Sequence, residues 1–209
     1  MIDEVDKVLP RRGHRFVRYA DDANVYVRSV RAGERVMALM RRMYGQLHLT
    51  VNETKSAVAS VFGRKFLGYS LWVARGGEVK RRVADKPMAT FKQTVRRLTR
   101  RSGGCSMHQV VERLRPYLLG WQAYYGLAQT PRVWRELDEG LRHRLRAIQL
   151  KQWKRGITTY RELRALGASV DVAAQVAANT RHWWRNSGGL LNSVLTIAWF
   201  DRLGVPRLS

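Results

Sequence analysis

The spacing of apolar residues changes near Lys86-Pro87, and this change constrains the fold more than any other feature of the sequence. Before it, short apolar runs alternate with polar residues and turn residues, as in mixed strands and helices. After it, apolar residues recur every three or four positions, as on the buried side of helices. The sequence therefore predicts an α+β fold in three parts: residues 1–85, a helical part over 86–166 and a helical tail over 167–209.

The first part is predicted to hold a strand, a turn and a second strand over residues 16–28, after a short charged helix or strand over residues 1–15. A helix is expected from about residue 32 to 45, with apolar side chains at helical spacing: Val36, Leu39, Met40 and Met43. The other predicted elements are strands over residues 47–51 and 56–61, and a hairpin formed by 66–72 and 78–83 around Gly76-Gly77.

The helical part is predicted to start with a basic amphipathic helix. Its apolar stripe is Phe91, Val95 and Leu98, and its cations lie off that stripe: Lys92, Arg96, Arg97, Arg100 and Arg101. Ser106 is expected to cap a second helix. Proline favours the first turn of a helix, so Pro116 is expected to start a third helix that ends near Gly126, and Pro131 a long one that ends near Arg155.

The charge of the chain indicates a polyanionic partner. Lys and Arg total 39 against 16 Asp and Glu, which gives a net charge of +23. Nucleic acid is the first expectation and an anionic membrane surface the second. Arginine outnumbers lysine 31 to 8, which suits bidentate phosphate contacts, although a GC-rich genome would also favour arginine codons. No apolar run approaches the ~20 residues of a membrane span, and the single Cys105 suits a reducing, cytoplasmic compartment.

Asp21 and Asp22 are adjacent carboxylates on the turn predicted between two strands. Hard cations such as Mg²⁺ prefer oxygen ligands, and nucleotidyl transfer uses two such ions to stabilise the attacking and leaving oxygens. A pair of neighbouring aspartates is also common on solvated turns. The flanking strands, with Ala23, Val25 and Val27 on one face, favour the layout of a polymerase palm.

Three segments in order resemble the reverse transcriptases encoded by bacterial group II introns: Tyr19-Ala20-Asp21-Asp22, Val51-Asn52-Glu53-Thr54-Lys55-Ser56 and Phe66-Leu67-Gly68-Tyr69. The resemblance implies that residues 1–85 form part of a reverse-transcriptase palm. It implies that Asp21 and Asp22 bind Mg²⁺ and are catalytic, and that Lys55 acts as a proton donor near the leaving pyrophosphate. Phe66, Leu67 and Gly68 would grip the primer strand. A surface lysine at a strand end is the alternative for Lys55.

A fourth segment, Leu119-Gly120-Trp121-Gln122-Ala123-Tyr124-Tyr125-Gly126, resembles the maturase-specific region of the same family, and the basic segments after it fit that family's thumb. Trp121 and Tyr125 lie four apart, which is also typical of core residues. Cations would neutralise phosphates, and nearby aromatic rings would stack on unpaired bases. The predicted RNA-binding residues are Arg96, Arg97, Arg100, Arg101, Tyr124, Arg142, Arg144, Arg146, Lys151, Trp153, Lys154 and Arg155. A solvated arginine-rich face is the alternative.

The resemblance also implies fingers and a first palm segment with a further metal-binding aspartate, and residues 1–15 are too few to hold them. We therefore expect a truncated chain that binds Mg²⁺ weakly or not at all and does not polymerise DNA alone. The expected partners are group II intron RNA, with target DNA and an N-terminal fragment as further candidates, and no membrane. The competing hypotheses are a non-catalytic RNA-binding maturase module and a gene remnant without a stable fold.

Overall fold

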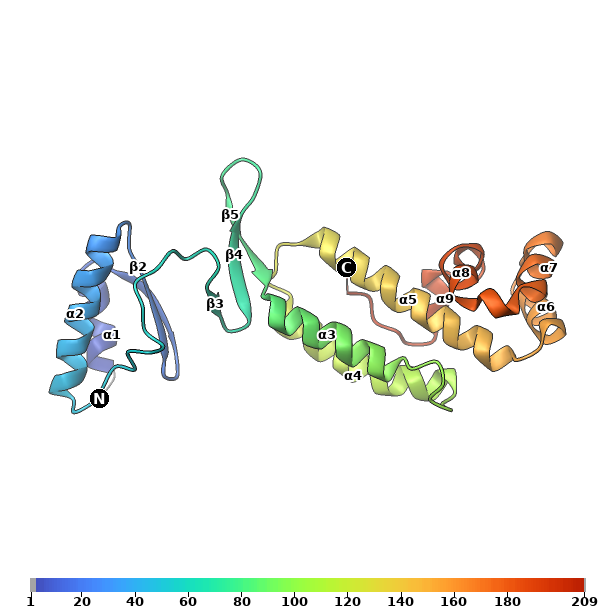
Figure 1. The fold of residues 1–209 in the computed structure, drawn as a ribbon, viewed down its shortest axis with the longest axis horizontal. Helices are drawn as coiled ribbons and strands as arrows, with labels where there is room; N and C mark the ends of the chain where they lie inside the picture. Colours follow the sequence, from blue (N-terminus) through green and yellow to red (C-terminus); the bar gives the residue numbers. More distant parts are fainter. Residues whose placement is uncertain (1–2, 209) are drawn as a thin grey trace. The chain divides into compact units, whose positions relative to one another are not determined.

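The computed structural model describes residues 3–208, which form two compact units, an N-terminal unit over residues 3–61 and a C-terminal unit over 62–208 (Figure 1). Both units combine helices with small antiparallel sheets, so the predicted α+β class is confirmed. The chain becomes helical at Asp85, where the apolar spacing changes. The sheet that precedes Asp85 belongs to the C-terminal unit, and the predicted division into residues 1–85, 86–166 and 167–209 stays a prediction.

The N-terminal unit consists of two helices and one β-hairpin. Its elements are α1 (Asp3–Arg11), β1 (Arg15–Tyr19), β2 (Asp22–Tyr26) and α2 (Val30–Gln46). Ser29 caps α2, because its hydroxyl accepts a hydrogen bond from the backbone N–H of Ala32. The predicted strands within residues 16–28 and the helix within 32–45 are thereby confirmed.

A small apolar core supports this hairpin. Val5, Leu9 and Val36 are buried at its centre, and partly buried side chains surround them: Phe16, Val25, Val27, Met40, Met43, Tyr44 and Leu47. Phe16 and Val25 are directly opposite each other in the antiparallel register. Because side chains alternate along a strand, this leaves Val17 and Tyr19 exposed on the other face. The hairpin therefore has one face in the core and one face in solvent.

The prediction of two further strands in this unit is wrong. Residues 47–51 and 56–61 form turns, bends and irregular backbone. Helix α2 continues to Gln46, and His48 has a positive φ of 56°, which interrupts an extended run across 47–51. Within residues 3–61 the one strand pair is β1 with β2, so 56–61 has no ladder to join. Val58 packs instead against Gly33 of α2, where an added Cβ would lie 2.4 Å from a Val58 methyl carbon.

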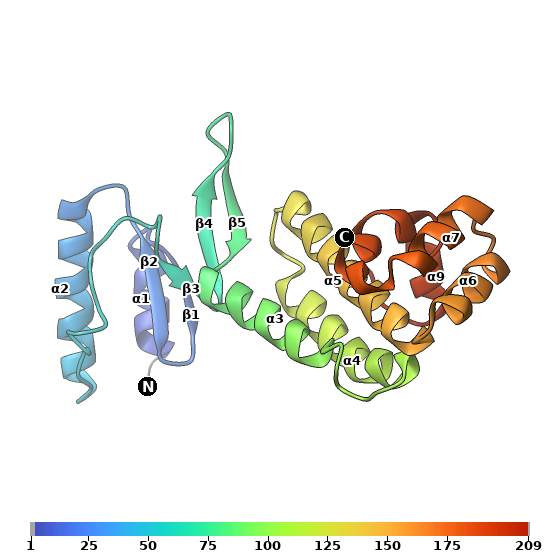
Figure 2. The ribbon, with the colours of Figure 1, turned by 45° about the vertical axis from the view of Figure 1, so that its right-hand side comes forward.

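The C-terminal unit begins with a three-stranded antiparallel sheet in the order β3-β4-β5 (Figure 2). Its strands are β3 (Lys65–Phe66), β4 (Tyr69–Val73) and β5 (Val79–Val83). Gly76 and Gly77 have positive φ angles of 103° and 85° in the turn between β4 and β5, which glycine adopts without steric cost. The predicted hairpin around these glycines is confirmed.

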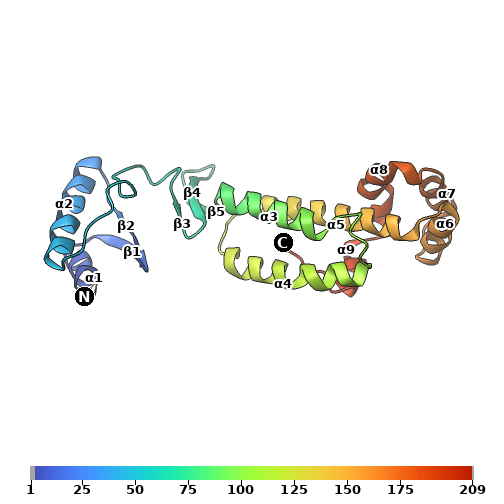
Figure 3. The same ribbon diagram turned by 60° about the horizontal axis from the view of Figure 1, so that its bottom comes forward.

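Helices form the rest of the C-terminal unit: α3 (Asp85–Leu98), α4 (Met107–Tyr125), α5 (Pro131–Trp153), α6 (Gly156–Ala165), α7 (Val170–Ala178), α8 (Trp183–Gly188) and α9 (Ile197–Arg202), with 3₁₀ turns at Thr180–His182 and Leu190–Ser193. Helices α3 and α4 run antiparallel side by side (Figure 3), with the rings of Phe91 and Trp121 4.1 Å apart between centroids. Pro131 opens α5, as predicted. No helix between residues 3 and 208 combines the length and apolarity needed to cross a membrane.

Helix α4 begins as predicted but does not break at its proline. The Ser106 hydroxyl accepts a hydrogen bond from the Gln109 N–H, and the Gln109 side chain accepts one from the Ser106 N–H, which completes a capping box. The helix start predicted at Pro116 is wrong, because Pro116 lies inside α4. An interior proline costs about 3 kcal/mol. Leu114 and Leu118, both fully buried, hold the helix in the core on either side of it.

A buried ion pair fixes the segment after α9 to the long helix α5. The Asp138 carboxylate accepts hydrogen bonds from the Arg142 guanidinium at 2.6 Å and from the Leu208 backbone N–H at 3.0 and 3.1 Å. The side chains of Asp138 and Arg142 are only 9% and 2% exposed. Asp201 lies 3.6 Å from Arg142 and accepts hydrogen bonds from Arg207, which hold the pKa of Asp201 below its usual value.

We predict that Asp138→Ala lowers the free energy of unfolding by about 3–5 kcal/mol, because it leaves the Arg142 charge buried without its closest partner. The matched control is Glu136→Ala on the same helix, whose exposed pair with Arg132 contributes about 1 kcal/mol or less. Urea unfolding followed by circular dichroism measures both. Equal stabilities for the two variants would contradict a structural role for the Asp138–Arg142 pair.

Candidate nucleic-acid interface

The two adjacent carboxylates lie on a tight turn of the N-terminal unit. Tyr19 and Asp22 are the last pair of the β1–β2 ladder, so Ala20 and Asp21 alone form the turn. Ala20 has a positive φ of 49°, a conformation that costs a non-glycine residue about 1–2 kcal/mol. Asp21 and Asp22 are both exposed. The hairpin, whose other face packs on the core of the N-terminal unit, therefore presents two carboxylates to solvent at a strained turn.

These carboxylates fit part of a Mg²⁺ coordination shell. Mg²⁺ prefers octahedral oxygen ligands and retains several waters, so two carboxylates are a usual protein contribution. Across residues 3–208, however, no group of three or more His, Cys, Asp or Glu side chains is placed to hold a metal ion. The donor set that the described residues provide at this turn is therefore Asp21 and Asp22.

Lys55, the third predicted catalytic residue, lies exposed in a turn organised by Asn52. The Asn52 side-chain oxygen accepts hydrogen bonds from the backbone N–H groups of Thr54 and Lys55, both at 3.2 Å. Glu53 in the same turn pairs with Arg41 of α2 through two hydrogen bonds of 2.8 and 2.6 Å. These contacts fix the backbone at Lys55 and leave its ammonium group exposed.

The segment predicted to grip a primer, Phe66-Leu67-Gly68, covers the end of β3 and the turn to β4, and it contacts the end of α4. Leu67 and Gly68 have positive φ angles of 50° and 76°. The Tyr124 hydroxyl donates a hydrogen bond to the Leu67 carbonyl at 3.2 Å. An added Cβ at Gly68 would lie 2.5 Å from the Tyr125 hydroxyl oxygen. The tyrosine pair of α4 therefore determines the shape of this turn.

The aromatic residues of α4 divide between core and surface. Trp121 is 8% exposed and its ring lies 5.1 Å from that of Trp134 on α5, so the core interpretation of Trp121 is confirmed. Tyr125 packs partly buried against the same core. Tyr124 is 54% exposed and keeps a free ring surface. Trp153, at the end of α5, is partly buried against the core.

Exposed cations gather where α3 and α5 end. Helix α3 and the loop after it supply Arg96, Arg97 and Arg100, and α5 with the turn after it supplies Lys151, Lys154 and Arg155; all six are exposed. Arg144 donates to the Thr99 hydroxyl at 2.6 Å, and Gln152 donates to the Cys105 carbonyl at 3.1 Å. These hydrogen bonds join the two helix ends. We call this region the cationic end.

Acidic residues are missing from the stretches that build the cationic end. Residues 86–111 and 140–161 contain no Asp or Glu, yet they hold 13 Lys and Arg residues. Burial, followed by the neighbouring charge of Arg96, lowers the pKa of Arg144. A guanidinium whose pKa is lowered by burial and by a neighbouring cation favours a polyanionic ligand, because a bound anion relieves the repulsion.

Two predicted RNA-binding arginines do not lie on an exposed face. Arg142 is 2% exposed and pairs with Asp138. Arg146 is 7% exposed and donates to the Leu195 carbonyl at 2.8 Å. Burial, with a smaller contribution from the Arg142 charge, lowers the pKa of Arg146 to about 10. The expectation that both charges face solvent is wrong, because residues 142 and 146 fall on the side of α5 that also buries Leu141 and Leu145.

Sequence reasoning missed the aromatic residues that adjoin the cationic end. Arg101 lies over the ring of Trp183, with its guanidinium carbon 4.2 Å from the ring centroid. The next residue, Trp184, stacks on His143 of α5 and is 46% exposed. The sequence signal that could have indicated these residues is the stretch 172–200, which has no acidic residue and holds two tryptophans beside Arg185.

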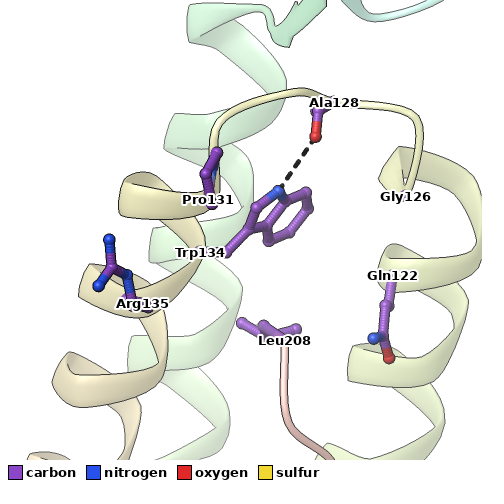
Figure 4. Close-up of a pocket in the computed structure, with 7 residues that line it drawn as sticks. All are labelled: Gln122, Gly126, Ala128, Pro131, Trp134, Arg135 and Leu208. Carbon is purple, nitrogen blue, oxygen red and sulfur yellow. Dashed lines mark hydrogen bonds between the residues drawn. The ribbon is translucent and has the colours of Figure 1, made fainter.

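One small cavity of about 390 Å³ lies between α4, α5 and the C-terminal segment (Figure 4). Trp134 and Leu208 line it, and the Trp134 indole N–H donates to the Ala128 carbonyl at 3.4 Å. Its one charged lining residue is Arg135. None of the predicted site residues lines this cavity. The exposed cationic end is therefore a better candidate for the nucleic-acid interface than the cavity is.

The fold and the cationic end define an α+β protein whose helical unit presents a dense positive surface. Residues 88–167, from α3 to just beyond α6, match the family described as "Group II intron, maturase-specific domain". The chain thus carries a group II intron maturase-specific domain, and the resemblance to group II intron maturases is confirmed for this part. The comparison with curated proteins gave no match. Residues 19–22 lie outside the matched range, so the palm interpretation stays a prediction.

We predict that Gly68→Ala destabilises the C-terminal unit by more than Gly76→Ala. Both glycines have positive φ, so both variants carry the conformational cost of about 1 kcal/mol. Gly76 has no heavy atom within 4 Å of an added Cβ, whereas at Gly68 the Cβ would displace the Tyr125 ring. Thermal unfolding of the two variants measures the difference. Equal melting temperatures would show that the turn does not depend on α4.

Proposed function

We propose that the C-terminal unit binds group II intron RNA through the cationic end and so assists folding of the intron for splicing. One observation carries the proposal: hydrogen bonds of Arg144 and Gln152 bring two acid-free, arginine-rich helix ends together inside the part of the chain that matches the maturase-specific domain. Structured RNA offers phosphates at a density that suits such a surface. Binding releases condensed counterions and is therefore strongly dependent on salt.

The contacts of the cationic end give its residues two different roles. Arg96, Arg97 and Arg100 are exposed and free to reach phosphates. Arg144 is partly buried, and it holds the end of α3 through the Thr99 hydroxyl and the carbonyls of Arg96 and Thr99. A substitution of Arg144 would thus disturb the surface and its support together. Exposed cations are the cleaner probes of RNA binding.

We further propose that the β1–β2 turn is the metal-binding turn of an RNA-directed DNA polymerase palm. The strained two-residue turn that presents Asp21 and Asp22, and the ordered segments around Lys55 and Leu67, support this proposal. Mg²⁺, when bound there, would stabilise the oxygens of nucleotidyl transfer. Since the described residues provide two carboxylates, we propose that the 209-residue chain alone binds Mg²⁺ weakly.

A non-catalytic RNA-binding maturase module is the second candidate function. The observation that favours it is the range of the family match, residues 88–167, which includes the cationic end and excludes the carboxylate turn. The two functions share the RNA-binding surface and differ in whether Asp21 and Asp22 do chemistry. Primer extension by the chain completed with an N-terminal fragment separates them, because only the polymerase function predicts DNA synthesis that Asp21→Ala abolishes.

We predict that Arg97→Gln with Arg100→Gln weakens binding to a structured intron RNA and reduces the magnitude of the slope of log affinity against log salt by about one per cation. The matched control, Arg132→Gln with Arg135→Gln, removes the same charge from the other end of α5. Filter binding at several salt concentrations measures both. Equal losses for the two double variants would contradict a localised interface.

We predict that Asp21→Ala leaves RNA affinity within about twofold of the parent chain, because the turn lies in the N-terminal unit and its substitution removes no cation. In a complete enzyme, the same substitution should abolish DNA synthesis by removing a metal ligand. Glu34→Ala, an exposed acidic substitution on α2, is the control for charge in the same unit. Unchanged primer extension by a complete Asp21→Ala enzyme would refute the palm assignment.

A further inference from the structure

Trp184 and His143 form an aromatic stack on the surface of the C-terminal unit. Their ring centroids are 3.8 Å apart and their planes are inclined by 26°. His143 lies on α5 and Trp184 on α8, so the stack joins two helices that are distant in sequence. The stack lies beside the cationic end, because Arg101 covers the ring of the adjacent Trp183.

The surroundings of His143 hold the stack in one geometry. The His143 Nε2 atom lies 2.8 Å from the backbone carbonyl oxygen of Trp184 and forms a hydrogen bond with it. An added Cβ at Gly188 would lie 3.0 Å from His143 Cε1, so the absence of a side chain at Gly188 makes room for the ring. The imidazole is thereby positioned before any ligand arrives, which lowers the entropic cost of binding.

Trp184 keeps much of its surface open despite this stack. Its exposed fraction is 46%, whereas Trp121 and Trp134 in the core are 8% and 7% exposed. His143 covers one face of the indole, and Trp183 meets it edge-on at 5.6 Å between centroids. The 46% of the Trp184 surface that remains exposed thus lies outside the face covered by His143. An aromatic ring that is supported on one face and still about half exposed suits a planar ligand.

The charge around Trp184 selects a polyanionic ligand. Arg181 and Arg185 flank it and are both exposed, and residues 172–200 contain no acidic side chain. A neutral apolar partner would gain nothing from these cations, whereas a nucleic-acid strand offers both a planar base and adjacent phosphates. Bases inside a duplex present edges rather than faces, so the ligand must be unpaired.

We infer that Trp184, supported by His143, is a stacking platform for an unpaired base of RNA, with Arg181 and Arg185 positioned for the flanking phosphates. The inference rests on the proposed RNA-binding function and adds to it the form of RNA that the helical tail recognises. Neither residue of the stack belongs to the set of RNA-binding residues predicted from sequence. Trp184 also lies outside the range that matches the maturase-specific domain.

The test compares Trp184→Ala and Trp184→Phe with the control Ile157→Ala, which removes a 74% exposed apolar side chain that belongs to no aromatic stack. Fluorescence anisotropy of the full chain measures affinity for labelled single-stranded RNA, single-stranded DNA and duplex RNA of one length, at two salt concentrations. The hydrogen bond to His143 uses the Trp184 backbone, so it can form in all three variants. Circular dichroism establishes that each variant is folded.

Trp184→Ala should lower affinity for single-stranded RNA by about 5- to 100-fold, the effect of one lost base stack. Duplex affinity and the salt slope should stay unchanged, Trp184→Phe should retain most of the affinity, and Ile157→Ala should bind as the parent chain does. Three results for Trp184→Ala would overturn the platform: an unchanged affinity for single-stranded RNA, equal losses of affinity for duplex and single-stranded RNA, or a loss of affinity for DNA alone. Each of them would leave the proposed RNA-binding function intact. Failure of the parent chain to bind any RNA would overturn both.

Discussion

The arginines of α5 organise the C-terminal unit because they are divided between its interior and its surface. Arg142 is buried against Asp138, and Asp138 in turn holds the backbone of Leu208. Two residues further on, Arg144 reaches Thr99 and secures the end of α3. A buried ion pair contributes little net stability, but removal of one partner is costly. The position of the C-terminal segment and that of the cationic end thus depend on one helix.

A surface as positive as the cationic end carries a cost of its own. Burial lowers the pKa of Arg144 most, and repulsion from the Arg96 charge on α3 lowers it further. Hydrogen bonds from Arg144 to the hydroxyl and carbonyl of Thr99, and from Gln152 to Cys105, offset this repulsion with neutral acceptors instead of carboxylates. Support of this kind leaves the exposed cations without intramolecular acidic competitors. The proposed RNA phosphates would then bind without first displacing a salt bridge.

Local patterns in the sequence predicted the elements whose causes are local. The Ser106 cap, the glycine turn at Gly76-Gly77 and the long helix from Pro131 follow from neighbouring residues, and all are confirmed. Pro116 was misjudged because burial of the side chains around it outweighs the local penalty of proline. Arg142 was misjudged for a similar reason: its partner Asp138 is one turn away, but its burial depends on the distant C-terminal segment. The stack of Trp184 on His143 joins residues 41 apart and has no local signature.

The turn at Leu67-Gly68 connects the two kinds of structure in the C-terminal unit. Its positive φ angles would be costly at Leu67 without support, and the Tyr124 hydroxyl supplies that support through the Leu67 carbonyl. The ring of Tyr125 occupies the space that a side chain at Gly68 would need. The segment that resembles a primer grip is therefore shaped by the maturase-specific helix α4. A displacement of α4 would disturb this turn, because Tyr124 and Tyr125 both belong to α4 and both contact it.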